Sequence, residues 1–281
     1  MQHYNVTIAG SLDDPQLRPY RTLRRSVEHI QIGIFVAEGE RVVRRLLASA
    51  LEVVSILVTK EWYERLEADK ELGRASSRAR ASSTPIAVFI ASKELLQTIV
   101  GYRLHQGIMA VGRVPASPRL EQMAEWKERR HLMVALDGLV NSENVGVVVR
   151  NAAAFGADAI IVGETASSPY LRRAVRNSMG AVFTLPIVHV SDLVESLTQL
   201  KQIYGTQIVA AHPHDATPIH EAEISGSVCV VFGNEGEGIS QRILSVCDVK
   251  VSIPMMHGTD SLNVASASAV FLYEVRRGRS S

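Results

Sequence analysis

The sequence predicts an α/β protein with two domains, the second of which is built on a parallel sheet. Short apolar runs alternate with segments of helical periodicity along most of the chain, and this alternation is typical of a sheet covered by helices on both faces. The 281 residues suit two domains of ~100–200 residues each. A stretch with two prolines begins at Pro115 and marks the boundary between them.

The first domain is expected to span residues 1–115. Four strands are expected there, at residues 34–37, 55–58, 86–90 and 107–114. Three helices are expected, at residues 40–50, 60–72 and 92–100. Apolar residues recur at helical spacing in the first helix, and Ser92 followed by Glu94 favours a helix start at the third. Residues 73–83 are polar and predict a surface loop.

Residues 116–130 are expected to link the domains and to contain a helix at 121–130. The second domain is then expected to span residues 131–281. Its strands are expected at residues 132–136, 159–162, 184–188, 207–211, 228–232 and 249–253. Helical segments separate most of these strands, and this arrangement indicates a parallel sheet.

Composition is ordinary for a soluble globular protein, with 46% hydrophobic and 21% charged residues. No apolar run reaches the ~18 residues of a membrane span, and the N-terminus lacks the regions of a signal peptide. Two cysteines, Cys229 and Cys247, predict reduced thiols and not a disulfide framework. A cytoplasmic location is therefore expected.

The net charge of +1 does not by itself indicate a nucleic-acid-binding protein, but its distribution is uneven. Residues 1–115 contain 16 basic and 12 acidic residues, whereas residues 116–281 contain 14 and 17. Arginine suits phosphate because its planar fork donates two hydrogen bonds at once. The alternative is a solvated charged face. Arg21, Arg24, Arg25 and Arg41 are the candidates for binding the phosphates of a nucleic acid.

Residues 253–274 form the most informative segment. An apolar strand stops at Pro254, a polar loop follows, and a helix rich in Ala and Ser then begins. Ser261 and Asn263 lie where this helix begins, so their side chains and the first free backbone N–H groups face the same spot. Small side chains let another group pack close to the helix. The loop is thus expected to bind a ligand through its backbone groups.

Two further segments accompany it. Residues 136–156 carry Asn144 and Arg150 on a predicted helix, where six residues span nearly two turns and predict both side chains on broadly one side. Residues 230–240 carry Glu235 in a glycine loop after a strand. This loop is neither a dinucleotide fingerprint, which needs a third glycine, nor a P-loop, which needs Lys-Ser/Thr. Its glutamates would repel a pyrophosphate.

The three segments, in this order, resemble the motifs of the SpoU family of RNA ribose 2′-O-methyltransferases. The resemblance covers roughly the last 150 residues. It implies a catalytic domain with a deep trefoil knot, S-adenosylmethionine as cofactor, RNA as substrate, and a homodimer whose active site needs both chains. More loosely, residues 35–41 and 105–111 resemble the small α/β RNA-binding domain that many members carry.

The same resemblance implies roles for individual residues. The implied catalytic set is Asn144, Arg150, Glu235, Ser261 and Asn263. The implied cofactor-binding set is Gly233, Asn234, Gly238, Ile253, Met255 and Leu262. One proposal for the family makes the arginine a general base. Because a guanidinium stays protonated in proteins, a charge role is favoured, in which it grips an RNA phosphate and stabilises developing alkoxide charge.

Several alternatives remain open. The two-domain layout favours rRNA, most of all 23S rRNA, because minimal tRNA enzymes of the family often lack the N-terminal domain. A tRNA enzyme and a non-catalytic RNA-binding or ribosome-assembly protein are the rivals, and the intact catalytic set argues against the second. Glu143 and Asn151 depart from the family pattern and leave the substrate open. His212 and His214 lack a second ligand cluster in sequence, so no metal is expected.

Overall fold

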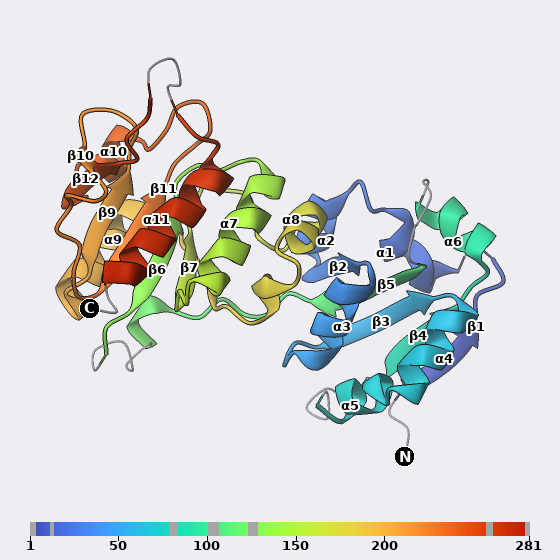
Figure 1. Cartoon of the computed structure of the whole chain (residues 1–281). Helices are drawn as coiled ribbons and strands as arrows, with labels where there is room; N and C mark the ends of the chain where they lie inside the picture. Colours follow the sequence, from blue (N-terminus) through green and yellow to red (C-terminus); the bar gives the residue numbers. More distant parts are fainter. Residues whose placement is uncertain are drawn as a thin grey trace. The chain divides into compact units, whose positions relative to one another are not determined.

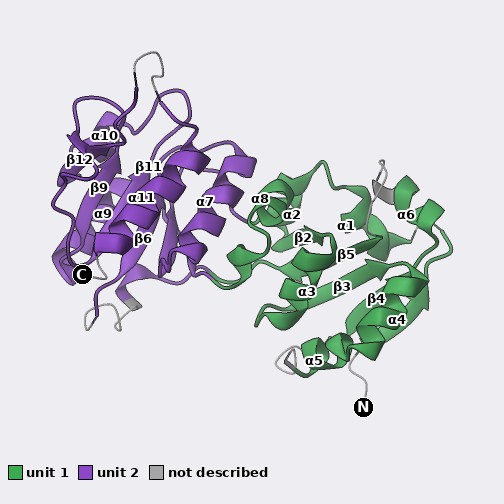
Figure 2. Ribbon diagram, viewed as in Figure 1, with its two compact units in different colours: residues 1–116, 170–184 green, residues 117–169, 185–281 purple. Residues whose placement is uncertain are grey.

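The computed structural model describes residues 4–11, 14–78, 84–100, 107–122, 129–256 and 261–278. The chain forms two compact units, drawn in Figures 1 and 2. The first consists of residues 1–116 and 170–184, and the second of residues 117–169 and 185–281. The segment 170–184 thus belongs to the first unit although it lies between two strands of the second. The division into 1–115, 116–130 and 131–281 stays a prediction.

The first unit contains a five-stranded mixed sheet in the order β1-β4-β3-β5-β2. Its strands are β1 (Tyr4–Ile8), β2 (Ile34–Glu38), β3 (Val53–Val58), β4 (Ile86–Ile90) and β5 (Ile108–Arg113). Strands β1, β4 and β3 run parallel, and β5 runs antiparallel to β3 and β2. The four predicted strands are confirmed. The edge strand β1 was not predicted, because most of its residues are exposed and polar and apolar residues mix there.

The helical elements of residues 1–116 are η1 (Pro15–Leu17), α1 (Arg18–Arg21), α2 (Ser26–Gln31), α3 (Glu40–Ala48), α4 (Lys60–Ala68), α5 (Glu71–Arg78) and α6 (Lys93–Val100). The three predicted helices are confirmed as α3, α4 and α6, although α4 ends at Ala68 and not at residue 72. The elements η1, α1, α2 and α5 were not predicted. The expected cap is present, since Ser92 Oγ accepts a hydrogen bond from Leu95 N at 3.2 Å. The loop expected at 73–83 is wrong for 73–78, which are helical because Leu72 and Ala75 are buried. Residues 79–83 lie outside the described residues.

The segment 170–184 packs within the first unit through charge and aromatic contacts. It contains α8 (Arg172–Asn177) and η5 (Ala181–Phe183). Arg172 Nη1 donates to the buried Glu38 carboxylate at 2.6 Å. The rings of Phe35 and Phe183 stack with centroids 5.4 Å apart. A paired buried carboxylate and stacked rings together fix this segment against β2.

The second unit contains a seven-stranded sheet in the order β10-β12-β9-β11-β6-β7-β8, and its neighbouring strands pair in parallel. The strands are β6 (Leu132–Leu136), β7 (Ala159–Val162), β8 (Ile187–His189), β9 (Gln207–Ala211), β10 (Thr217–Pro218), β11 (Val228–Phe232) and β12 (Val249–Ser252). The predicted parallel sheet is confirmed. Strand β8 starts at Ile187, later than expected, because Thr184 ends the 3₁₀ turn η5 and residues 185–186 connect that turn to the strand. The trefoil knot stays a prediction.

Helices cover both faces of this sheet (Figure 1). They are α7 (Ser142–Ala154), α9 (Leu193–Tyr204), α10 (Gln241–Leu244) and α11 (Val264–Gly278). On one face, Leu193, Leu197 and Ile243 of α9 and α10 join a buried apolar cluster with the strands. On the other, α7 and α11 lie side by side. Of the helix expected at 121–130, the described residues show a short 3₁₀ turn, η3 (Leu120–Gln122), and residues 123–128 lie outside them.

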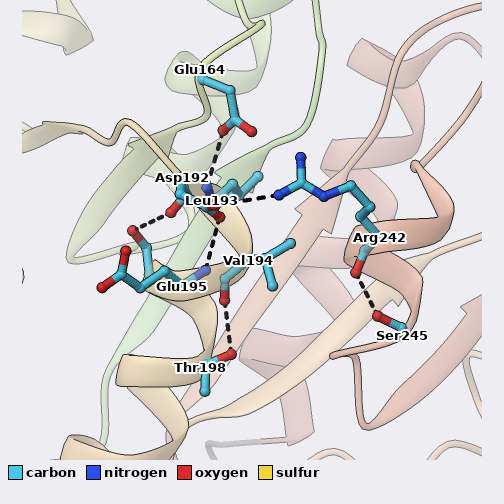
Figure 3. A network of polar contacts seen from close by, with 9 residues as sticks. Glu164, Asp192, Leu193, Val194, Glu195, Thr198, Arg242 and Ser245 are labelled. Atoms are coloured by element: carbon cyan, nitrogen blue, oxygen red, sulfur yellow. Dashed lines mark hydrogen bonds and ion pairs between the residues drawn. The ribbon is translucent and has the colours of Figure 1, made fainter.

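A polar network at the N-terminus of α9 fixes two helices of the second unit (Figure 3). Asp192 caps α9 by accepting from Glu195 N at 3.0 Å, and it also accepts from Arg242 Nη2 at 3.3 Å. Glu164 accepts from Leu193 N at 3.0 Å. Capping carboxylates favour a helix N-terminus. The network therefore anchors α10, the helix that directly follows the glycine loop.

Both cysteines are free thiols, as expected. Cys229 is fully buried in β11, and burial raises the pKa of its thiol. Partial burial raises the pKa of the Cys247 thiol to about 11. Raised pKa values keep both groups protonated and unreactive near neutral pH. In the described part of the chain, no helix combines the length and apolar character needed to cross a bilayer.

Candidate functional site

A cavity of about 460 Å³ opens at the carboxyl ends of three neighbouring strands of the second unit. His212 follows β9, Gly233 follows β11 and Ile253 follows β12, and all three residues line it. Open parallel sheets bind ligands outside the carboxyl ends of their strands. The volume lies in the ~300–1,000 Å³ range of small-molecule sites. The fold therefore presents a ligand site where three loops meet.

Two aromatic rings form an apolar part of the cavity wall. Phe232 ends β11 and Phe271 lies on α11, and both side chains are buried. Their ring centroids are 5.9 Å apart in an edge-to-face arrangement. Val264 and Ala267 of α11 line the same cavity. The small side chain of Ala267 leaves room beside the rings for a flat apolar or heteroaromatic group.

The glycine loop after β11 closes on itself through its backbone. Asn234 N donates to Gly238 O at 2.9 Å, and Gly238 N donates to Asn234 O at 3.0 Å. A Cβ atom on Gly233 would lie 2.3 Å from the carbonyl carbon of Gly238, a distance that real Cβ atoms do not show. Gly238 has a φ of +71°, which favours glycine. The loop thus depends on two glycines for two different reasons.

The Asn234 side chain organises the same loop. Its Oδ1 accepts from Gly236 N at 2.8 Å and Glu237 N at 3.1 Å. Its Nδ2 donates to Gly138 O at 2.8 Å, in the loop that follows β6. Asn234 lines the cavity, but these bonds occupy its amide. We therefore expect it to shape the loop and to offer backbone groups to a ligand.

Three of the expected catalytic residues form one hydrogen-bonded chain. Asn144 Nδ2 donates to Glu235 Oε1 at 2.9 Å. Asn144 Oδ1 accepts from Asn263 Nδ2 at 3.4 Å, and Asn263 Oδ1 accepts from Ala265 N at 2.8 Å at the start of α11. The backbone N–H fixes the orientation of the Asn263 amide, and this orientation in turn fixes that of Asn144. Residues from three separate sequence segments therefore meet beside the cavity, which Glu235 and Asn263 line and which Asn144 reaches only through its hydrogen bonds to them.

The remaining expected residues divide between the cavity and the surface. Five of them line the cavity beside Glu235 and Asn263, namely Gly238, Ile253, Met255, Ser261 and Leu262. Arg150 is exposed on α7 and is not part of the cavity lining. The expectation that Arg150 and Asn144 share one side of the helix is wrong, because six residues turn a helix by ~600° and leave the two side chains ~120° apart.

Comparison with known proteins identifies the fold and the family together. The model of the SpoU rRNA Methylase family matches residues 131–273, more than half of the chain. The chain belongs to this family. The matched range contains every strand of the second unit and all three segments that meet at the cavity. The sequence-based expectation of a SpoU RNA 2′-O-methyltransferase with an additional N-terminal α/β domain is confirmed.

Relatives support the assignment over most of the chain. An uncharacterized tRNA/rRNA methyltransferase of Mycobacterium bovis is 32% identical over 273 residues, which cover 94% of this chain and 90% of the relative. The 23S rRNA (guanosine-2′-O-)-methyltransferase RlmB of Neisseria meningitidis is 31% identical over 215 residues, with 74% and 85% covered. The similarity to the mycobacterial relative therefore includes both compact units.

Solved structures show the same two-unit fold. An AdoMet-bound rRNA methyltransferase of Sinorhizobium meliloti superimposes with a TM-score of 0.78 at 23% identity and covers 97% of this chain and 98% of its own. An RNA 2′-O ribose methyltransferase superimposes with a TM-score of 0.73 at 27% identity, with 97% and 98% covered. The α/β class and the additional N-terminal unit of this SpoU protein are thus confirmed.

Sequence reasoning missed the loop after β9 as part of the site. His212, Pro213 and His214 line the cavity, whereas from the sequence the two histidines were considered only as possible metal ligands. The available signal was the position of β9 beside β11, which puts both strand ends at one edge of the sheet. In the parts of the chain described here, no group of three or more His, Cys, Asp or Glu side chains gathers as a metal site would.

Asn151 joins the two helices that carry the site, α7 and α11. Its Nδ2 donates to Ala265 O and to the buried Ser268 Oγ, both at 2.9 Å. We expect Asn151→Ala to lower the free energy of unfolding by about 1–3 kcal/mol, because two partly buried hydrogen bonds are lost. Urea denaturation measures this change.

Asn177→Ala is the matched control. Asn177 Nδ2 also makes a 2.9 Å bond to a carbonyl oxygen, but this bond is exposed and stays within its own helix, α8, where it reaches Arg173. Surface changes of this kind usually stay within about 0.5 kcal/mol. Equal destabilisation by the two variants would show that Asn151 does not hold α7 to α11.

Proposed function

We propose that this SpoU protein transfers the methyl group of S-adenosylmethionine to a ribose 2′-hydroxyl in structured RNA, and that the RNA is 23S rRNA. The observation that carries the proposal is the cavity at three strand ends, whose lining residues Glu235 and Asn263 are both hydrogen-bonded to Asn144. The family supplies the reaction class, and the cavity supplies a place for the cofactor. The hydrogen-bonded side chains of Asn144, Glu235 and Asn263 supply fixed polar groups beside the cofactor.

The chemistry of the cavity fits S-adenosylmethionine. Phe232 and Phe271 offer apolar surface for an adenine ring. Glu235 and Glu237 offer negative charge for a cationic cofactor that carries no phosphate. The tight turn at Gly233 brings backbone groups close to the ligand. When bound, the cofactor supplies an electrophilic methyl group on a positively charged sulfur.

Methyl transfer requires the ribose oxygen, the methyl carbon and the sulfur to lie in one line. Asn144 is suited to positioning, because its amide is held at both ends by Glu235 and Asn263. Ser261, exposed at the cavity mouth, is suited to contact the incoming RNA. These groups orient the reactants before the reaction, and preorganised polar groups require little rearrangement during it.

Arg150 enters this scheme from a second copy of the chain. It lies on α7, is exposed, and is absent from the lining of its own cavity. A homodimer that pairs the α7–α11 surfaces would present Arg150 to the partner's cavity. There its guanidinium grips an RNA phosphate and stabilises developing negative charge on the ribose oxygen. A general-base role for Arg150 is the alternative.

The choice of rRNA rests on the first unit and on the relatives. Arg21, Arg24, Arg25 and Arg41 are exposed on that unit, and a relative with 31% identity is a 23S rRNA enzyme. The mycobacterial relatives carry the broader description tRNA/rRNA methyltransferase, so tRNA is the second candidate substrate.

Titration of the protein with S-adenosylmethionine by calorimetry tests catalysis against a purely RNA-binding role. Saturable binding at one site per chain supports catalysis, and no binding at millimolar cofactor would reject it.

Neutralising Arg21, Arg24 and Arg25 together is expected to weaken RNA binding and to flatten its dependence on salt. The three lie around the α1–α2 turn and are exposed, with Arg25 3.7 Å from Glu28. Each lost phosphate contact should lower the slope of log affinity against log salt by about 0.7–0.9. Filter binding between low and moderate salt measures the slope. An unchanged slope would mean that these arginines form only a solvated face.

The dimer predicts that a charge on the exposed face of α11 yields inactive monomers. Val270 and Tyr273 are 40% and 56% exposed there, and a buried unpaired charge is strongly unfavourable. Val270→Arg should therefore dissociate the dimer. Ala267 is unsuitable for this test, because it lines the cavity and a larger side chain would block the cofactor.

Sedimentation velocity and methyl transfer are measured on the same samples. Gln202→Arg, on the exposed face of α9, is the matched control and should remain dimeric and active. A wild-type protein that is fully active as a monomer at assay concentration would contradict the composite site.

A further inference from the structure

We propose that His212 binds the α-carboxylate of S-adenosylmethionine through its Nε2 atom and thereby recognises the amino-acid end of the cofactor. The inference rests on the proposed function and assigns a specificity role to the loop after β9. His212 and His214 line the cavity, yet neither belongs to the three motifs that identify the family. The reasons are the charges of the cavity wall and the fixed orientation of one imidazole ring.

The cavity wall is poor in groups that can bind an anion. Among the described residues that line it, the titratable side chains are His212, His214, Glu235 and Glu237, and no Lys or Arg is present. The ammonium and sulfonium groups of the cofactor match the two glutamates. The carboxylate of the cofactor would be repelled by the two glutamates and needs a different partner. An imidazole is the side chain of this wall that can become positively charged.

The ring of His212 is oriented by its own loop. Nδ1 lies 2.6 Å from the backbone oxygen of His214. A carbonyl oxygen can only accept, so Nδ1 must carry the hydrogen, and the 3.3 Å approach of His214 N to the same atom is not a donation. Among the described residues, no hydrogen-bond partner of Nε2 is found. The loop therefore leaves Nε2 as the ring atom available to a ligand.

A proton must then accompany carboxylate binding. With Nδ1 already protonated, Nε2 can donate only when the ring is an imidazolium, and a carboxylate strongly favours that form. Binding of S-adenosylmethionine near pH 7.5 should take up a proton, whereas binding of a ligand without the carboxylate should not.

Decarboxylated S-adenosylmethionine is the matched probe, because it keeps the sulfonium and amino groups and lacks only the carboxylate. Calorimetry in buffers of different ionisation enthalpy gives affinity and proton uptake together. The wild type should prefer S-adenosylmethionine by about ten- to a hundred-fold, the value of a hydrogen bond to a charged group. His212→Ala should remove this preference and the proton uptake, and leave the affinity for the decarboxylated ligand unchanged.

Two more variants complete the test. His220→Ala removes an exposed histidine that lies outside the cavity lining, so it should retain the preference and the proton uptake. His212→Gln carries a neutral amide, which donates a hydrogen bond without first taking up a proton. This variant should therefore retain part of the preference for S-adenosylmethionine and lose the proton uptake. If His212→Ala also fails to bind the decarboxylated ligand, the substitution has disturbed the cavity itself. The role of His212 is then judged from the preference of the His212→Gln variant.

The outcomes distinguish this inference from the proposed function. A wild type that binds neither ligand would reject both. Wild-type binding of both ligands with equal affinity, or a preference that survives in His212→Ala, would overturn the role of His212 and leave the methyltransferase assignment standing. A Gln variant without any preference would also overturn it.

Discussion

Replacing Arg150 with Ala is expected to lower methyl transfer by at least ~10²–10³-fold, the loss seen when one charge-stabilising group is removed from an active site. Affinity for S-adenosylmethionine should stay close to the wild-type value, because Arg150 does not line the cavity of its own chain. Lys should restore little activity, since it lacks the planar fork that binds two phosphate oxygens at once. Single-turnover methylation and calorimetry measure the two quantities separately.

Arg130→Ala is the control for the Arg150 variant. Arg130 is also an exposed arginine of the second unit, and no role in the site is proposed for it. Its variant should methylate RNA at the wild-type rate. Substantial turnover by Arg150→Ala, or a loss of activity explained by lost cofactor affinity, would contradict the role proposed for Arg150.

Replacing Gly233 with Ala is expected to abolish cofactor binding, with an affinity at least about a hundred-fold lower. The added Cβ would lie 2.3 Å from Gly238 C and 2.4 Å from Gly238 O, both backbone atoms that cannot rotate away. The paired backbone bonds between Asn234 and Gly238 must then break. Overpacking of this kind also costs about 1–3 kcal/mol of stability. Calorimetry and urea denaturation measure the two effects.

Gly236→Ala provides the comparison within the same loop. A Cβ there would meet only Asn234 Oδ1, at an ordinary 3.5 Å. This variant should bind the cofactor nearly as the wild type does. If both alanine variants bind equally well, the closed loop is not what shapes the cofactor site.

The two variants also test the composite site when they are mixed. An Arg150→Ala chain keeps its cavity and lacks the arginine, whereas a Gly233→Ala chain lacks a working cavity and keeps the arginine. A heterodimer of the two contains one complete site if Arg150 acts on the partner's cavity. Activity should therefore reappear on mixing and subunit exchange. Continued inactivity of verified heterodimers would place Arg150 in its own chain's site.

Much of the fold could be predicted because its strands are buried on both faces. Strands β6 and β11 are fully buried, so each appears as a continuous apolar run with helices on either side. Strand β1 lies at a sheet edge and β10 has two residues, and neither leaves such a pattern. Helix α5 was missed because Gly73, Ser76 and Ser77 disfavour helix in isolation. Tertiary contacts outweigh that preference, since Leu72 and Ala75 are buried against the rest of the unit.

The candidate site was predictable where motifs mark it and not where packing decides it. The resemblance named Asn144, Glu235 and Asn263, and the structure joins them by hydrogen bonds. Spacing in the sequence predicted Arg150 and Asn144 on one side of the helix. The turn of ~100° per residue along α7 instead puts the two side chains ~120° apart. His212 has no motif of its own. Its role follows from the parallel pairing of β9 with β11, which no local pattern reveals.

The central claim is methylation of a ribose 2′-hydroxyl in RNA, and a map of 2′-O-methyl positions tests it most directly. Total RNA from cells with and without the gene is compared by alkaline-hydrolysis sequencing, and the 23S rRNA is then methylated with purified protein and S-adenosylmethionine. We expect one 23S rRNA ribose to lose its methyl group without the gene, and to regain it with the wild type but not with Arg150→Ala. Identical maps in the two strains, or transfer of the methyl group to a base, would contradict the account.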